Sequence, residues 1–141
     1  MKSKTILVAY QDDPGTKSLP TFFRDLGYRV EVTKGLGDMI RKVREGNVHV
    51  VLLDGEIEGV KACDVVPVLR KDLRVQVILI SSEESLSSMR RLREMGIFYQ
   101  AMKPADPEEI RSAVECALEK IDREHPTEGF FFFPIPEIAP A

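Results

Sequence analysis

The sequence alternates between two hydrophobic rhythms, and this alternation constrains the fold more than any other feature. Five short runs are rich in β-branched and aliphatic residues: Thr5 to Tyr10, Tyr28 to Val32, Val48 to Leu53, Val75 to Ile80 and Phe98 to Met102. The segments that follow these runs carry apolar residues at helical spacing, as in Leu19, Phe22, Phe23 and Leu26. Strands that alternate with helices in this way predict a parallel sheet covered by helices on both faces.

The character of each run predicts its place in the sheet. The runs Val48 to Leu53 and Val75 to Ile80 are almost entirely apolar, which is typical of central strands buried from both sides. The run Tyr28 to Val32 alternates with Arg29 and Glu31, which favours an edge strand. With right-handed crossovers, we predict a flavodoxin-like (βα)5 α/β fold, a three-layer sandwich whose five-stranded parallel sheet has the order 2-1-3-4-5.

The last helix is the most clearly marked, and it sets the predicted end of the domain. Asp106 can cap it, Pro107 occupies the first helical position and Glu109 falls at the third. We therefore expect a domain over residues 1–123, followed by an apolar, proline-rich tail over residues 124–141. The segment Phe130 to Pro136 is too apolar for a free linker, so we expect it to lie extended against its own domain or against a second copy in a homodimer.

Charge and length limit the classes of partner. The 141 residues suit one domain with a short tail, and a net charge of -3 provides no basic field for nucleic acid. No apolar run approaches the ~20 residues that a membrane span needs, and the N-terminus carries no cleavage-site pattern. We expect a cytoplasmic protein that binds neither nucleic acid nor membrane.

Polar residues follow four of the five predicted strands. They are Asp12 and Asp13 after the first strand, Asp54 after the third, Ser81 after the fourth and Lys103 after the fifth. In a doubly wound sheet the carboxyl ends of the strands share one edge, where ligands bind. We therefore expect these side chains to converge.

This set of groups could carry out phosphoryl transfer to a carboxylate. Asp54 would be the nucleophile, and Lys103 would offset the charge that builds during attack. A divalent cation between carboxylates would do the same, and Mg²⁺ prefers such oxygen ligands. Ser81 would hydrogen-bond a phosphoryl oxygen and so sense its presence.

Each residue also has a structural explanation. An aspartate such as Asp54 commonly caps a helix or forms a turn, Ser81 could cap the next helix, and Lys103 could be a solvated loop residue. Asp12 and Asp13 precede Pro14 and Gly15, a composition typical of turns. Only the joint placement of these residues at four strand ends favours a functional site.

At this point the chain resembles the response-regulator receiver domains of bacterial two-component signalling, over roughly residues 4–122. The most specific parts are Val50 to Asp54, Val77 to Ser82 and Met102 to Pro104. The resemblance implies that Asp54 is the phosphoacceptor, Ser81 the hydroxyl switch residue and Lys103 the active-site lysine. It also implies a cis bond between Lys103 and Pro104.

The resemblance implies partners as well. A histidine kinase or phosphotransfer protein would donate the phosphoryl group, and a downstream effector would read the face around the fourth helix and fifth strand. Such a domain is not an enzyme beyond self-catalysed phosphotransfer and dephosphorylation. Its metal would be Mg²⁺, for which we take Asp12, Asp13 and Asp54 as candidate ligands.

Three segments depart from the family pattern. Tyr10 and Gln11 stand where the acidic metal-binding pair is expected, so Asp12 and Asp13 come two residues late. The segment 55–59 lacks the usual Met-Pro, and Gln100 occupies the aromatic switch position in the fifth strand.

Two further functions stay open, and the departures favour the first of them. One is a pseudo-receiver, a protein-binding module that works without phosphorylation. The other is a nucleotide- or flavin-binding enzyme, suggested only by the segment Gly15 to Ser18, which resembles part of a phosphate loop but lacks the upstream glycines.

Overall fold

The computed structural model describes residues 4–9, 17–33, 35–71, 74–82 and 86–124. The elements are β1 (Thr5–Ala9), α1 (Leu19–Asp25), β2 (Arg29–Thr33), α2 (Leu36–Arg44), β3 (Val50–Asp54), β4 (Glu56–Ile57), β5 (Val60–Lys61), α3 (Ala62–Leu69), β6 (Gln76–Ser81), α4 (Leu86–Glu94), β7 (Tyr99–Met102) and α5 (Pro107–Glu124). Among these residues, no helix is long and apolar enough to cross a bilayer. The tail predicted over residues 124–141 falls, apart from its first residue, outside the described residues.

Five of the strands form one parallel sheet in the order β2-β1-β3-β6-β7. This is the predicted order 2-1-3-4-5, since β6 and β7 are the fourth and fifth strands of the sheet in chain order. The apolar strands β3 and β6 lie at the interior of the sheet, and β2, with its alternating charges, lies at the edge. The flavodoxin-like α/β fold predicted from the sequence is confirmed.

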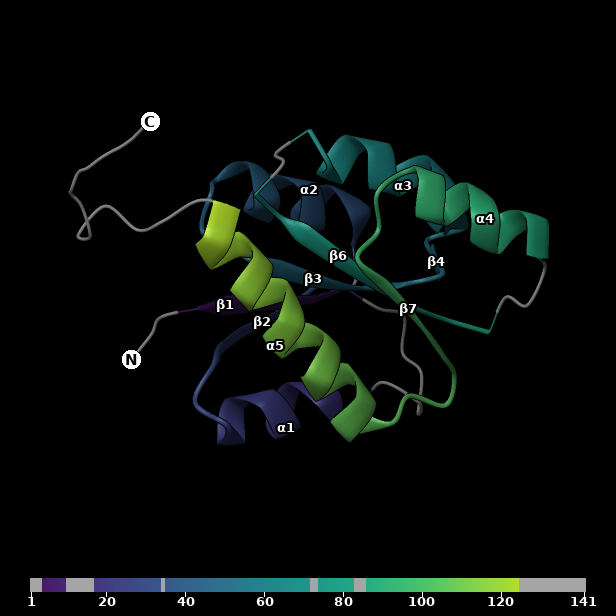
Figure 1. The fold of residues 1–141 in the computed structure, drawn as a ribbon. Helices are drawn as coiled ribbons and strands as arrows, with labels where there is room; N and C mark the ends of the chain where they lie inside the picture. The colour runs from purple at the N-terminus through teal and green to yellow at the C-terminus, as the bar shows by residue number, and fades with distance from the viewer. Residues whose placement is uncertain (1–3, 10–16, 34, 72–73, 83–85, 125–141) are drawn as a thin grey trace, which may run out of the picture.

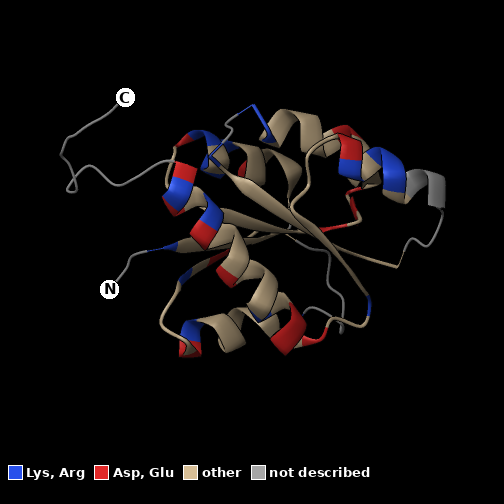
Figure 2. Ribbon diagram, in the orientation of Figure 1, with Lys and Arg blue, Asp and Glu red and all other residues tan. Residues whose placement is uncertain are grey.

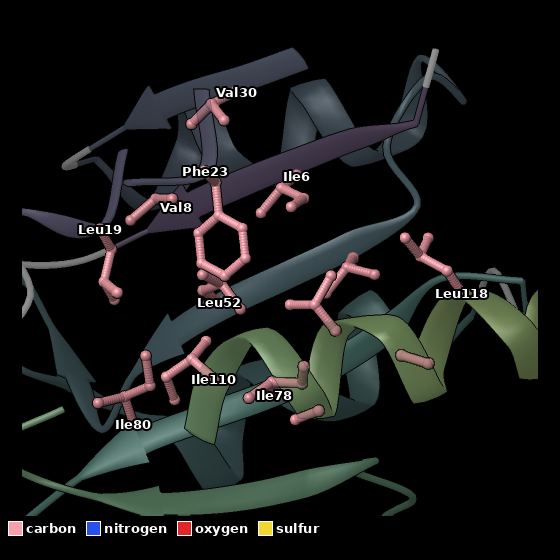
Figure 3. Packing of buried hydrophobic residues seen from close by; sticks show 14 of the residues in the cluster. Ile6, Val8, Leu19, Phe23, Val30, Leu52, Ile78, Ile80, Ile110 and Leu118 are labelled. Atoms are coloured by element: carbon pink, nitrogen blue, oxygen red, sulfur yellow. The ribbon is translucent and has the colours of Figure 1, made fainter. Parts of the chain in front are cut away.

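Helices cover both faces of the sheet (Figure 1). One buried cluster joins Val50 and Leu52 of β3 to α1 and α5, and Figure 3 shows Phe23 of α1 and Ile110 of α5 within it. The other cluster joins Val51 and Leu53 of the same strand to α2, α3 and α4. Because alternate residues of a strand point to opposite faces, a continuous apolar run can feed both cores at once.

The start of α5 follows the predicted pattern. The Asp106 carboxylate accepts a hydrogen bond from the backbone N–H of Glu108 at 3.1 Å, and Pro107 is the first helical residue. The apolar stripe of this helix is buried, namely Ile110, Ala113, Val114, Ala117, Leu118 and Ile121. The helix therefore packs along the sheet through this stripe.

A two-stranded hairpin that the sequence analysis did not predict stands between β3 and α3. Its strands β4 and β5 are antiparallel, with Ile57 paired to Val60. Glu58 turns the chain with a φ of 53°, and Ile57 is buried in the core beneath it. The hairpin therefore begins in segment 55–59, which lacks the Met-Pro of the family pattern.

Candidate functional site

The register of the sheet brings three of the predicted site residues together. Asp54 is the last residue of β3 and pairs with Ile80, while Ser81 is the last residue of β6 and pairs with Met102. Lys103 directly follows Met102, so the three side chains come from three neighbouring strands. Asp54 and Ser81 were expected just after their strands, and each instead ends its strand. Each still pairs with a residue of the neighbouring strand, so it belongs to the strand that it ends.

Asp54 and Lys103 form an ion pair at the centre of the site. The Lys103 Nζ lies 3.0 Å from Asp54 Oδ1, with the Asp54 side chain 6% exposed and that of Lys103 20% exposed. A carboxylate so far removed from water is unfavourable unless it is paired and hydrogen-bonded. The ammonium supplies the pairing, and the backbone N–H of Glu56 donates at the long distance of 3.5 Å.

Ser81 is joined to Lys103 through the backbone. The Lys103 N–H donates to the Ser81 carbonyl oxygen at 3.1 Å, and the Ser81 side chain is buried. The Lys103–Pro104 peptide bond is cis, as predicted. A shift of the Ser81 backbone therefore acts directly on the backbone position of Lys103.

The expected metal ligands are only partly described. Asp12 and Asp13, together with Tyr10 and Gln11, lie outside the described residues. In the part of the chain that is described, no three His, Cys, Asp or Glu side chains gather as a metal site would require. Asp54 itself is an oxygen ligand of the kind that Mg²⁺ prefers, so the described donor fits that ion. The proposed Mg²⁺ site stays a prediction.

The hairpin after Asp54 is tied to α2. The Glu58 carboxylate accepts a hydrogen bond from the Leu36 N–H at 2.8 Å, at the first residue of that helix. The first N–H groups of a helix have no partner within it, and an acceptor with negative charge suits that end. Nothing in the spacing of Glu58 and Leu36 along the chain indicates this contact, because it depends on the hairpin.

The edge strand β7 carries two exposed apolar side chains, Tyr99 and Met102. The Tyr99 hydroxyl donates to the Glu109 carboxylate of α5 at 2.6 Å, and this bond raises the pKa of Tyr99. Gln100 between them is half-buried, and its Nε2 has no hydrogen-bond partner in the described part of the chain.

Opposite charges flank this strand. The ribbon in Figure 2 is blue at basic positions along α4 and red at acidic positions at the start of α5. The basic residues are Arg90, Arg91 and Arg93, all exposed, and the acidic ones are Glu108 and Glu109. The face built by α4, β7 and α5 is thus mixed in charge and apolar at its centre.

Comparison with known proteins gives one consistent result. The family described as "Response regulator receiver domain" matches residues 6–115. The DNA-binding transcriptional regulator NtrC of Azospirillum brasilense is 31% identical over 121 residues, which cover 84% of this chain and 25% of that protein. The DNA-binding response regulator MtrA of Mycolicibacterium smegmatis is 27% identical over 125 residues, covering 88% of this chain and 54% of that protein. The chain thus spans between a quarter and about half of these relatives.

Solved structures agree on the fold. A CheY-like response regulator receiver domain protein of Methanospirillum hungatei JF-1 superposes with a TM-score of 0.78 at 21% identity, covering 87% of this chain and 99% of that chain. The signal receiver domain of an HD domain-containing protein of Pseudomonas fluorescens Pf-5 gives 0.78 at 16% identity, over 86% of this chain and 99% of the other.

Proposed function

The chain belongs to the response regulator receiver domain family, and on this premise we propose that Asp54 accepts a phosphoryl group from a histidine kinase or phosphotransfer protein. Receiver domains act in two-component signalling as phosphoacceptors rather than as enzymes on a separate substrate. The observation that carries the proposal is the buried Asp54–Lys103 pair at 3.0 Å, at the carboxyl edge of the sheet beside Ser81. The position of this pair at the edge where ligands bind to such sheets favours a chemical role for it.

The transfer uses the Asp54 carboxylate as a nucleophile. A carboxylate oxygen forms a bond to the phosphorus of a phosphohistidine, and the P–N bond breaks with its electron pair returning to the histidine nitrogen, which takes up a proton. The product is an acyl phosphate on Asp54. Lys103 shifts from the carboxylate to the phosphoryl oxygens as charge accumulates there, and the Ser81 hydroxyl donates to one of them.

We assign Mg²⁺ to the same edge of the sheet, held by Asp54 together with Asp12 or Asp13. The ion supplies positive charge against the repulsion between two anionic reactants. Asp12 or Asp13 would complete its ligands from the segment after β1, where they come two residues later in the sequence than the family's acidic pair.

The response reaches the surface through Ser81. This residue ends β6 and pairs with Met102 of β7, whose side chain is exposed on that edge strand. Movement of the Ser81 hydroxyl toward the phosphoryl group alters the packing beneath β7. We propose that a downstream effector binds the face of α4, β7 and α5 in response.

A titration with Mg²⁺ and beryllofluoride, a mimic of the phosphoryl group, tests the acceptor. In amide NMR spectra, we expect shifts around Asp54, Ser81 and Lys103 that saturate with both ions present. Asp54→Asn abolishes them, whereas Asp64→Asn, at an exposed position on α3, leaves them unchanged. If the wild-type spectrum is the same with and without both ions at millimolar Mg²⁺, Asp54 is not a functional acceptor.

One observation favours a second function, that of a pseudo-receiver which binds a protein without phosphorylation. Gln100 stands on β7 where the family pattern has an aromatic switch residue, and its buried amide nitrogen lacks a partner among the described residues. Under this alternative, Asp54→Ala leaves the affinity for the effector unchanged with or without a phosphodonor. Under the phosphoacceptor proposal, the phosphodonor changes the affinity of the wild type but not that of Asp54→Ala.

A further inference from the structure

Gly55 follows the acceptor directly, and its backbone conformation does not explain why a glycine stands there. Gly27, Gly46, Gly59 and Gly96 adopt positive φ, where side chains are strained, but Gly55 does not. An alanine at position 55 therefore meets no backbone penalty. The reason for the glycine lies in the space beside it.

That space holds the hydroxyl of Ser81. A Cβ atom on residue 55 would lie 2.8 Å from Ser81 Oγ and 3.1 Å from Ser81 Cβ, closer than ordinary van der Waals contact. The cause is the register of the sheet, because Asp54 pairs with Ile80 and the next residues on each strand face one another. At Gly37, by contrast, an added Cβ has no atom within 4 Å.

We propose that Gly55 is a positioning residue for the Ser81 hydroxyl, and this inference rests on the proposed phosphoacceptor function. The missing side chain leaves the Oγ atom a place at the end of β3, next to the residue that carries the phosphoryl group. A methyl group at position 55 forces the hydroxyl into another staggered rotamer, turned away from that place. The hydrogen bond from Ser81 to a phosphoryl oxygen is then lost, while Asp54 and Lys103 keep their pair.

The backbone around Gly55 is held on both sides, so the chain has little freedom to relieve the contact. The Gly55 carbonyl oxygen accepts a hydrogen bond from the Ala62 N–H at 2.9 Å, at the start of α3. On the other strand, the Ser81 carbonyl is bonded to the Lys103 N–H. The side chain of Ser81 is the part that moves.

The test is a double-variant cycle on the full chain, with the dissociation constant of beryllofluoride in saturating Mg²⁺ as the readout. A lost hydrogen bond to a charged group corresponds to about ten- to hundredfold weaker binding. We expect that loss for Gly55→Ala and for Ser81→Ala, and no further loss when both are combined. Gly37→Ala, the matched control, binds as the wild type does. The affinity for Mg²⁺ alone is the same in all variants, which a general distortion of the site would not allow.

Different outcomes separate the two claims. If the wild type does not respond to beryllofluoride, the proposed function fails and this inference with it. If the wild type responds but Gly55→Ala binds equally well, or if the two losses multiply in the double variant, the role of Gly55 is overturned while the acceptor stands. If Gly55→Ala does not fold, Ser81→Ala must restore folding in the double variant. Failure to do so also overturns the inference.

Discussion

Removing the two members of the buried ion pair should have unequal effects on stability. Lys103→Met takes away the ammonium and leaves the Asp54 carboxylate, which is 6% exposed, without the partner 3.0 Å away. Asp54→Asn removes the buried charge itself and leaves Lys103, which is 20% exposed and can reach water. The less exposed member suffers more from the loss of its partner, so Lys103→Met is expected to be the more destabilising change.

The magnitude follows from the burial of the pair. At 3.0 Å the gross attraction is about 5.5 kcal/mol for an effective dielectric constant of ~20. Removing one partner of a buried pair costs about 3–5 kcal/mol, and the partial exposure of Lys103 places this case lower, at about 2–3 kcal/mol. For Asp54→Asn we expect a loss below about 1 kcal/mol, because the amide is isosteric and no charge is left buried.

Urea unfolding at neutral pH measures the loss in the free energy of unfolding for both variants. A chelator in the buffer prevents a divalent cation from taking the place of the Lys103 ammonium beside Asp54. Lys71→Met, at an exposed position after α3, is the matched control and should change the free energy of unfolding by less than about 0.5 kcal/mol. Equal losses for Lys103→Met and Asp54→Asn, or a larger loss for Asp54→Asn, would refute this account of the pair.

Three other perturbations test the surrounding structure. Glu58→Ala removes the acceptor of the Leu36 N–H, so it should lower the free energy of unfolding by about 0.5–1 kcal/mol and speed hydrogen exchange of the Leu36 amide. Glu58→Gln keeps an acceptor oxygen and should retain most of the stability and most of the protection from exchange. Equal stability and equal exchange rates in the two variants would contradict the capping role of Glu58. Gln76→Met should raise the free energy of unfolding by about 1 kcal/mol, because the buried side-chain amide of Gln76 has no hydrogen-bond partner among the described residues. A lower free energy of unfolding would show that this side-chain amide is hydrogen-bonded. His49 accepts from the Thr5 N–H, and burial lowers its pKa below 6.5, so the unfolded chain binds the proton more readily. The contribution of neutral His49 to the free energy of unfolding is full above pH ~6.5 and is lost as the pH falls toward the pKa of the folded state. His49→Gln should therefore reduce the slope of the free energy of unfolding against pH in this range. An unchanged slope would refute the assignment of this pH dependence to His49.

The fold could be predicted because its signals are local and periodic. The apolar runs at β3 and β6 and the alternating charges of β2 follow from which faces of each strand are buried. The stripe of α5 likewise follows from helical geometry. The convergence of Asp54, Ser81 and Lys103 then follows from the sheet, since the ends of parallel strands share one edge.

The features that escaped prediction depend on contacts between distant segments. The hairpin of β4 and β5 is too short to give a periodic signal in the sequence. The burial of Ile57 and the hydrogen bond from the Leu36 N–H to Glu58 hold it in place. The role of Gly55 could not be read from its neighbours in the sequence either. It depends on the register that brings Ser81 beside it from another strand.

The central claim is that Asp54 is chemically competent to accept a phosphoryl group. Incubation with Mg²⁺ and a small acyl phosphodonor, followed by intact-mass measurement and peptide mapping, tests it most directly. We predict one added phosphoryl group per chain, mapped to Asp54, lost on treatment with hydroxylamine and absent from Asp54→Asn. Asp64→Asn should be labelled to the same extent as the wild type. No added mass on the wild-type chain with Mg²⁺ present, or a label that persists in Asp54→Asn, would contradict the account.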